Sequence, residues 1–164
     1  MIVVAAYQTE YDKDEQVSYV QAVETLNCPF CDCSELIKKG WRKRKLFMLI
    51  GTFMILMIRR VKCKTCGKIH HVLPNTIVPY KRYDAETIKK IIEGNSSEIC
   101  CEECTANRIK AWWADMRLYI LIVAPLIMKK HKIRIKPELN LTQAVLTLAN
   151  THLWPGTRSA LEPG

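Results

Sequence analysis

Two pairs of cysteines, each with two residues between its members, constrain this chain more than any other feature. The pairs are Cys28 with Cys31 and Cys63 with Cys66. Four thiolates at this spacing are the usual ligands of a closed, tetrahedral structural zinc site. A redox-active dithiol is the alternative, but two pairs favour a metal. We therefore predict one structural zinc ion on these four cysteines, and we expect it to contribute folding energy to the segment.

The segment between the two pairs has the pattern of a β-hairpin. Its apolar and basic residues predict strands over 39–49 and 53–62, joined near Gly51. Gly67 offers the left-handed backbone position that follows the second pair, and Asp32 stands at the matching position after the first. Second-choice metal ligands within reach of the pairs are Cys33, His70 and His71.

Charge is distributed unevenly along the 164 residues, whose net charge is +9. Residues 1–35 carry 1 basic and 7 acidic side chains, whereas residues 36–83 carry 13 basic and no acidic ones. Residues 84–164 are nearly balanced, with 11 basic and 9 acidic side chains. A positive field confined to one segment indicates a polyanionic partner. Composition alone does not show whether that partner is nucleic acid or an anionic membrane.

Neither apolar run is long enough to predict a transmembrane helix. Residues 46–58 and 118–128 span 13 and 11 residues, whereas a helix needs roughly 20 to cross a bilayer. The N-terminus has no basic region of the kind that begins a secretory signal. The cysteine spacing also fits metal ligation better than a disulfide framework. We therefore expect a cytoplasmic protein that does not use a membrane.

Short elements are expected on either side of the hairpin. Before it, the pattern predicts a short strand over 2–7, an acidic turn over 9–15 and a helix over 17–26. After it, Asp84 is the expected N-cap of a helix that Gly94 ends.

The second half of the chain is expected to be helical. A short helix over 98–104 and a more strongly patterned helix over 105–119 should follow the first. The second of these should pack the side that carries Ile109, Trp112, Trp113 and Met116 against the core, with both tryptophans as anchors. A basic strand over 129–136 and a helix over 138–153 should close the chain.

A helix, a short turn and a second helix that begins with polar and basic residues form the pattern of a helix-turn-helix. Asn107, Arg108 and Lys110 stand near the start of the second helix, so they are the expected contacts to base edges. A third CxxC lies just before it, at Cys101 and Cys104, next to Cys100. The neighbouring glutamates disfavour reactive thiolates, so we expect buried, inert cysteines there.

The hairpin and its continuation resemble the N-terminal zinc-ribbon domain of bacterial insertion-sequence transposases. The resemblance is carried by Cys28-Pro29-x-Cys31, by the basic residues 42–45, by Arg59-Arg60-Val61-x-Cys63-x-x-Cys66, and by His71 and Pro74. The segment 73–83 is similar to small stand-alone zinc-ribbon proteins associated with transposases, a family without a known function. The resemblance implies zinc-supported binding to duplex DNA at the ends of mobile elements, in an accessory or truncated transposase without the acidic catalytic domain.

We therefore predict an α+β protein in which a zinc-ribbon hairpin precedes a helix-turn-helix-like part, with no enzymatic activity. The expected segments are an acidic arm (1–26), the zinc ribbon (27–80), the helix-turn-helix-like region (81–119) and a C-terminal helical segment with a tail (120–164). The partners expected are DNA and, in addition, a transposase subunit. The residues expected to contact phosphates are Lys38, Lys39, Arg42, Lys43, Arg44, Lys45, Arg59 and Arg60.

Two other classes of function remain open from the sequence. The ribbon is also typical of modules that mediate protein–protein contacts in transposition or transcription complexes, including transcriptional regulators. The cysteines at 100, 101 and 104 would instead suit a redox or metal sensor, with a second metal site or a reactive dithiol.

Overall fold

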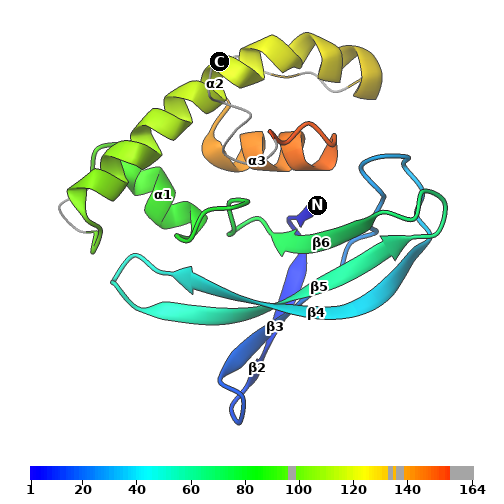
Figure 1. The fold of residues 1–164 in the computed structure, drawn as a ribbon, viewed down its shortest axis with the longest axis horizontal. Helices are drawn as coiled ribbons and strands as arrows, with labels where there is room; N and C mark the ends of the chain where they lie inside the picture. The colour runs from blue at the N-terminus through cyan, green and yellow to red at the C-terminus, as the bar shows by residue number, and fades with distance from the viewer. Residues whose placement is uncertain (96–98, 133–134, 136–138, 156–164) are drawn as a thin grey trace.

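The fold is a curled six-stranded sheet with three helices on one side of it (Figure 1). The computed structural model describes residues 1–95, 99–132, 135 and 139–155. The elements are β1 (Ile2–Val4), β2 (Tyr7–Asp12), β3 (Val17–Ala22), β4 (Leu36–Phe47), β5 (Phe53–Cys63), β6 (Ile69–Pro74), α1 (Ala85–Ile92), α2 (Glu103–His131) and α3 (Leu141–Asn150). The expected α+β class is confirmed.

β5 organises the sheet, because three strands pair with it. β4 runs antiparallel along one edge of β5 as the predicted hairpin. On the other edge, β6 pairs antiparallel with residues 60–62 and β3 pairs parallel with residues 56–58. β1 lies parallel to β6, and β2 forms a hairpin with β3 that projects below the sheet in Figure 1.

The first 26 residues contain three strands. β1 lies within the strand expected over 2–7, but β2 occupies much of the turn expected over 9–15, and β3 replaces the helix expected over 17–26. Val17 and Val20 are spaced like residues on one face of a helix, yet both lie in β3. Val20 pairs with Ile58 and faces the helices, while the neighbouring Tyr19 packs edge-to-face on Trp41 with ring centres 5.0 Å apart. β-branched valines favour strands, and here pairing with β5 decides the outcome.

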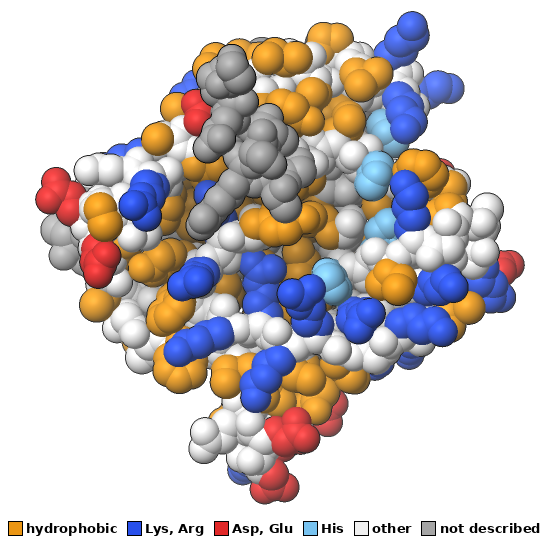
Figure 2. All heavy atoms as spheres, in the orientation of Figure 1, with side chains coloured by type: hydrophobic (Ala, Val, Ile, Leu, Met, Phe, Trp, Pro, Cys, Tyr) orange, Lys and Arg blue, Asp and Glu red, His pale blue; other side chains and the backbone are white. Residues whose placement is uncertain are grey.

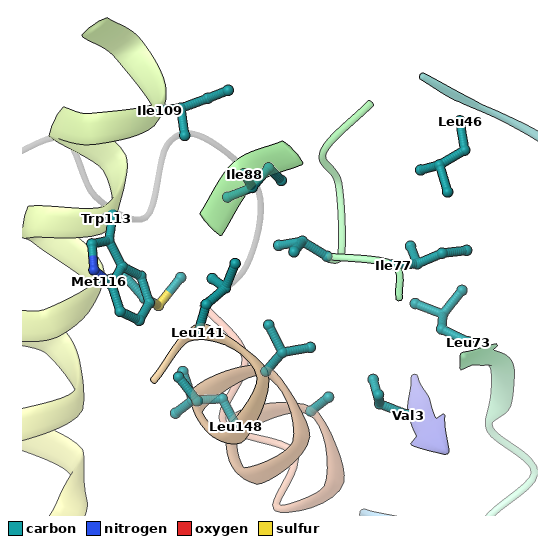
Figure 3. Close-up of a cluster of buried hydrophobic side chains, with 14 of the residues drawn as sticks. Val3, Leu46, Leu73, Ile77, Ile88, Ile109, Trp113, Met116, Leu141 and Leu148 are labelled. Carbon is teal, nitrogen blue, oxygen red and sulfur yellow. The ribbon is translucent and has the colours of Figure 1, made fainter. Parts of the chain in front are cut away.

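The main hydrophobic core fills the space between the sheet and the three helices (Figure 3). Val3 and Leu73 from the sheet belong to the same cluster as Ile88 of α1, Trp113 of α2 and Leu148 of α3. A smaller cluster on the opposite face of the sheet contains Ile2, Val4, Val61 and Val72. Alternate residues of β1 therefore enter different cores, as the period-2 geometry of a strand requires.

α1 follows its predicted capping. The Asp84 carboxylate accepts a hydrogen bond from the Thr87 backbone N–H at 2.9 Å, and Gly94 follows the helix at φ 86°. The expected short helix over 98–104 is wrong for residues 99–102, which are not helical, and residues 96–98 lie outside the described residues. Residues 93–102 therefore separate α1 from α2, whereas a helix-turn-helix joins its helices by three or four residues.

α2 is longer than the predicted helix over 105–119. Its buried face carries Ile109, Trp113 and Met116 as expected, whereas Trp112 is only half-buried. The helix also continues through Pro125 to His131. Pro125 removes one backbone hydrogen bond to the carbonyl of residue 121, and both residues are exposed, so water can satisfy that carbonyl. The strand expected over 129–136 is therefore wrong for residues 129–131.

α3 lies within the predicted helix over 138–153, and Asn140 caps it by accepting a hydrogen bond from the Gln143 N–H at 2.9 Å. The start of that predicted helix and the end of the predicted strand fall in part outside the described residues.

By length and composition alone, α2 is also long and apolar enough to cross a membrane. Its most apolar window of 18 residues has a mean hydropathy of 1.4, and 28% of that window is buried in the fold. The core helix of a soluble protein passes the same test, so this property is weak support for a membrane span.

Candidate metal centre and basic groove

The two cysteine pairs sit on matching knuckles at one end of the β4–β5 hairpin. In the first, the Asp32 N–H donates to the Cys28 carbonyl at 2.8 Å, and Asp32 has φ 59°. In the second, the Gly67 N–H donates to the Cys63 carbonyl at 3.1 Å, and Gly67 has φ 70°. Both predicted left-handed positions are confirmed. Each turn directs its two sulfur atoms toward the other knuckle.

The four predicted ligands come together, and they could bind a metal ion. Their sulfur atoms all lie within 4.8 Å of one another. The Sγ atoms of Cys28 and Cys66 are 3.6 Å apart, and so are those of Cys31 and Cys63. Cys28 and Cys63 are buried, while the other two are more open to solvent.

The thiols of this cluster do not ionise independently. A hydrogen bond from the backbone N–H of Cys66 is the main reason why the pKa of the Cys63 thiol falls to about 6. The Cys33 backbone N–H lowers the pKa of Cys31, but burial and the neighbouring sulfur atoms, first that of Cys63, outweigh it and raise this pKa to about 12. One thiolate therefore forms readily, and its negative charge opposes ionisation of the neighbouring thiols. A cation at the centre of the cluster would remove that opposition.

The second-choice ligands Cys33, His70 and His71 lie outside the cluster. His70 is buried, with its Nε2 3.3 Å from the Cys28 Sγ and its Nδ1 3.5 Å from the Met1 nitrogen. Burial, together with the positive Met1 amine, lowers the pKa of His70 to about 4, so the ring is neutral at pH 7. A neutral ring can donate from Nε2 to a Cys28 thiolate, which is the supporting role that histidine often takes beside a metal ligand. The Cys33 sulfur instead accepts a hydrogen bond from the Glu35 N–H at 3.3 Å.

The third cysteine group lies near the tip of the hairpin, away from the metal ligands. A Cβ atom built on Gly51 would stand 3.0 Å from the Cys100 Cβ. Cys100 and Cys104 are exposed and Cys101 is half-buried, so the expectation of buried cysteines is not met there. Among the described residues, they do not form a metal-ligating cluster of their own.

Strand geometry divides the predicted phosphate contacts between the two faces of the sheet. Arg42 pairs with Ile58 and Arg44 with Leu56, so these arginines face the helices. The intervening Lys43 and Lys45 face the other side, as does Arg59. A bulge between Lys38 and Trp41 sets this alternation; Gly40 lies within it at φ 84°.

On the face away from the helices, the cations lie over aromatic rings. The Arg59 guanidinium carbon is 3.5 Å from the centre of the Trp41 ring, and the Lys45 Nζ is 3.7 Å from that of Phe53. Lys38 lines a separate cavity of about 220 Å³ together with Arg59. The positive groups of Arg59 and Lys45 on this face therefore lie against the faces of aromatic rings.

On the face toward the helices, a cavity of about 420 Å³ opens between β4 and the connector that follows β6. We call it the basic groove. The cations that face it are Arg42, Arg44, Lys81 and Arg82, and His71 and Tyr80 complete the polar lining. Lys43 and Lys45 also border the cavity, but their side chains lie on the other face of the sheet. Carboxylates are absent from the described residues of its lining. Figure 2 shows Lys and Arg side chains gathered over the sheet below the helices, with acidic side chains toward the edges of this face.

Arg44, which lines the groove, also fixes its two sides relative to each other. The Arg44 Nη2 donates to the Lys81 carbonyl at 2.7 Å and to the Val78 carbonyl at 3.2 Å, which ties the connector to β4. The Lys81 Nζ lies 4.0 Å from the centre of the Trp112 ring, so the same connector also contacts α2. Arg44 therefore has a structural role that the sequence did not predict, and Lys81, Arg82 and His71 join the predicted basic surface.

The pKa of His71 is affected by the positive charges that surround the groove. Burial first, then the charges of Arg42 and Arg60, lower its pKa below the ordinary value of 6.5. Arg60 pairs with His71 across β5 and β6, and its Nε is buried without a hydrogen-bond partner in the described structure. Several cations thus surround one half-buried imidazole.

The remaining predicted contacts lie elsewhere. Asn107, Arg108 and Lys110 are exposed on the first turns of α2, and none of them is among the described residues that line the groove. Lys39 is exposed within the β4 bulge.

The fold and the cysteine cluster together define a small α+β protein with a candidate metal centre beside a basic groove. The chain belongs to the family described as Domain of unknown function (DUF6431), whose profile matches residues 28–110, about half of the chain. The matched segment begins at the first cysteine of the cluster and contains β4, β5, β6, α1 and the start of α2. No curated protein and no solved structure matches the chain.

Proposed function

We propose that this protein is a zinc-dependent DNA-binding protein with no enzymatic activity of its own. Zinc is the metal that four thiolates favour. A tetrahedral ion with Zn–S bonds of about 2.3 Å would place the sulfur atoms about 3.8 Å apart. The two Sγ–Sγ distances of 3.6 Å in the cluster fit that spacing. Zinc would fix the end of the hairpin whose strands line the basic groove.

The basic groove is the observation that carries the proposal. Arg42 and Arg44 face it from β4, while Lys81 and Arg82 face it from the connector. Cations concentrated in a cavity, with low-dielectric walls behind them, attract a polyanion more strongly than the same charges spread over a surface. The phosphates of a nucleic-acid backbone are the ligand that suits such an array, since guanidinium groups bind them in a bidentate manner.

The start of α2 is the proposed source of sequence preference. Asn107, Arg108 and Lys110 are exposed there, and their side chains suit base edges in a major groove. The long connection between α1 and α2 does not have the usual helix-turn-helix spacing. Base contacts are therefore assigned to the exposed start of α2 alone, through these three side chains. Replacing Arg108 with Ala should reduce the preference for a selected sequence while leaving affinity for random duplex nearly unchanged.

The biological setting proposed is that of a cytoplasmic transposase accessory, or of a truncated transposase, which binds the ends of mobile elements. This part rests on the resemblance of the cysteine frame and of residues 73–83 to transposase-associated zinc ribbons. A transposase subunit is then the expected protein partner.

The salt dependence of DNA affinity tests the groove. The double variant Arg42→Gln, Arg82→Gln removes two charges from the groove, and Lys13→Gln, Lys89→Gln removes two exposed charges elsewhere. Each lost phosphate contact should lower the slope of log affinity against log salt by about 0.9, so the groove variant should lose about 2. Fluorescence anisotropy with a labelled duplex measures both slopes. Equal slopes for the two variants would show that net charge, rather than the groove, sets the affinity.

A further inference from the structure

The second half of α2 presents a row of apolar side chains to solvent. Leu118 is 62% exposed, Ile122 is 76% exposed and Leu126 is 52% exposed. They recur every four residues, so they lie one above another on the helix. The opposite side of the same helix is already committed to the core through Met116, Ile120 and similar residues. The row is therefore an additional surface that does not pack in the core. We call it the α2 stripe.

Charges of opposite sign end the α2 stripe at equal distances from its centre. Asp115 precedes Ile122 by seven residues and Lys129 follows it by seven. Seven residues are close to two helical turns, so both charged side chains lie on the same side of α2 as Ile122. Asp115 is the only acidic residue of α2 beyond its first turn. Both residues are exposed, and neither has an ion-pair partner among the described residues.

This arrangement is complementary to itself under a two-fold rotation. If two copies of α2 cross antiparallel at Ile122, Leu118 of each copy faces Leu126 of the other. The same rotation brings Asp115 of each copy to Lys129 of the other, which gives two identical ion pairs. A two-fold interface requires one surface patch to fit its own rotated copy, and the α2 stripe meets that requirement in the spacing of its apolar residues and in its charges.

We propose that the protein forms an antiparallel homodimer through the α2 stripe, with Asp115 and Lys129 setting the register. The apolar row supplies the attraction, and the two ion pairs exclude the parallel arrangement, in which like charges would meet. This interface is separate from the basic groove and does not depend on the DNA-binding proposal. A single pair of helices is a small interface, so a dissociation constant of about 1 μM or weaker is expected.

Charge reversal tests the dimer without disturbing the core, because both residues are exposed on α2. Sedimentation velocity of the zinc-loaded chain over a concentration series should show the mass of a dimer at high concentration. Asp115→Lys and Lys129→Asp should each shift the protein to monomer, because each single variant sets two pairs of like charges against one another. The double variant Asp115→Lys, Lys129→Asp should recover the dimer. Circular dichroism should be unchanged in all three.

A second variant and a control separate the proposal from its competitors. Ile122→Asp should give a monomer at every concentration, while Ile50→Asp changes an equally exposed isoleucine outside α2 (78% exposed) and should leave the dimer intact. A monomeric wild-type protein at all concentrations, or failure of the double reversal to recover the dimer, would overturn the proposal. So would a protein that is monomeric alone and binds vesicles of phosphatidylglycerol and phosphatidylcholine through Ile122, since the stripe would then contact lipid.

Discussion

The side-chain amide of Asn150 hydrogen-bonds to both backbone polar groups of Val3. Its Oδ1 accepts from the Val3 N–H at 2.8 Å, and its Nδ2 donates to the Val3 carbonyl at 2.8 Å. β1 has a neighbouring strand on one side only, where β6 pairs with it. One residue of α3 therefore occupies the position of a missing strand. This contact joins the two ends of the described chain and closes the sheet edge against further pairing.

Removing that amide should destabilise the fold. Asn150→Ala leaves the N–H and carbonyl of the buried Val3 without their partners, so the free energy of unfolding should fall by about 1–2 kcal/mol. Asn150→Asp should be no better, because its second oxygen would face the Val3 carbonyl. Gln143→Ala, at an exposed position of the same helix, should change stability by less than about 0.5 kcal/mol. Urea unfolding monitored by circular dichroism measures all three; equal stability of Asn150→Ala and wild type would contradict the account.

The cap of α1 gives a second prediction. Asp84 is nearly buried and satisfies the Thr87 N–H, so Asp84→Ala should lower the free energy of unfolding by about 1 kcal/mol. Asp84→Asn retains an acceptor oxygen and should lie within about 0.5 kcal/mol of wild type. Thermal unfolding of the zinc-loaded protein separates the two variants. Equal losses would assign the effect to the charge of Asp84 rather than to its hydrogen bond.

The metal centre gives a third prediction. Cys63→Ser removes one of the four candidate ligands from a buried position. The purified protein should therefore no longer bind the proposed zinc ion, and the knuckle end of the hairpin should unfold. Cys33→Ser is the matched control, because Cys33 lies two residues after Cys31 but outside the cluster. Metal content by inductively coupled plasma mass spectrometry and the thermal midpoint report the result. One zinc per chain in the Cys63→Ser protein would contradict the assignment.

The sequence predicted the elements that local chemistry decides. Cysteine spacing identified the candidate metal ligands, Asp84 located the start of α1, and the apolar and basic runs on either side of Gly51 located the hairpin. Each of these depends on residues within a few positions of one another.

The features that the sequence missed depend on distant contacts. Val17 and Val20 are spaced like helical residues, and only pairing with β5 makes them a strand. The helix predicted over 105–119 ended too early, because α2 continues through Pro125 with its other face fixed in the core. The groove needs the connector beside β4, which Arg44 holds by hydrogen bonds that span more than thirty residues.

Titration of His71 should make DNA affinity depend on pH. Burial, reinforced by Arg42 and Arg60, lowers the pKa of His71 below 6.5, so the ring is neutral in the free protein at pH 7. A phosphate in the groove would favour the protonated ring and raise that pKa. Binding then takes up a proton, and affinity should rise by about three- to tenfold as pH falls from 7.5 to 5.5.

Matched histidine variants assign this effect. His71→Gln should bind duplex with an affinity that is nearly independent of pH over this range. His152→Gln changes an exposed histidine that does not line the groove, so it should keep the wild-type dependence. Anisotropy titrations at constant salt measure the affinities, and metal content at each pH confirms that the cluster stays loaded. If His71→Gln keeps the full pH dependence, the phosphate does not lie beside His71, and the binding surface must be placed on the other face of the sheet.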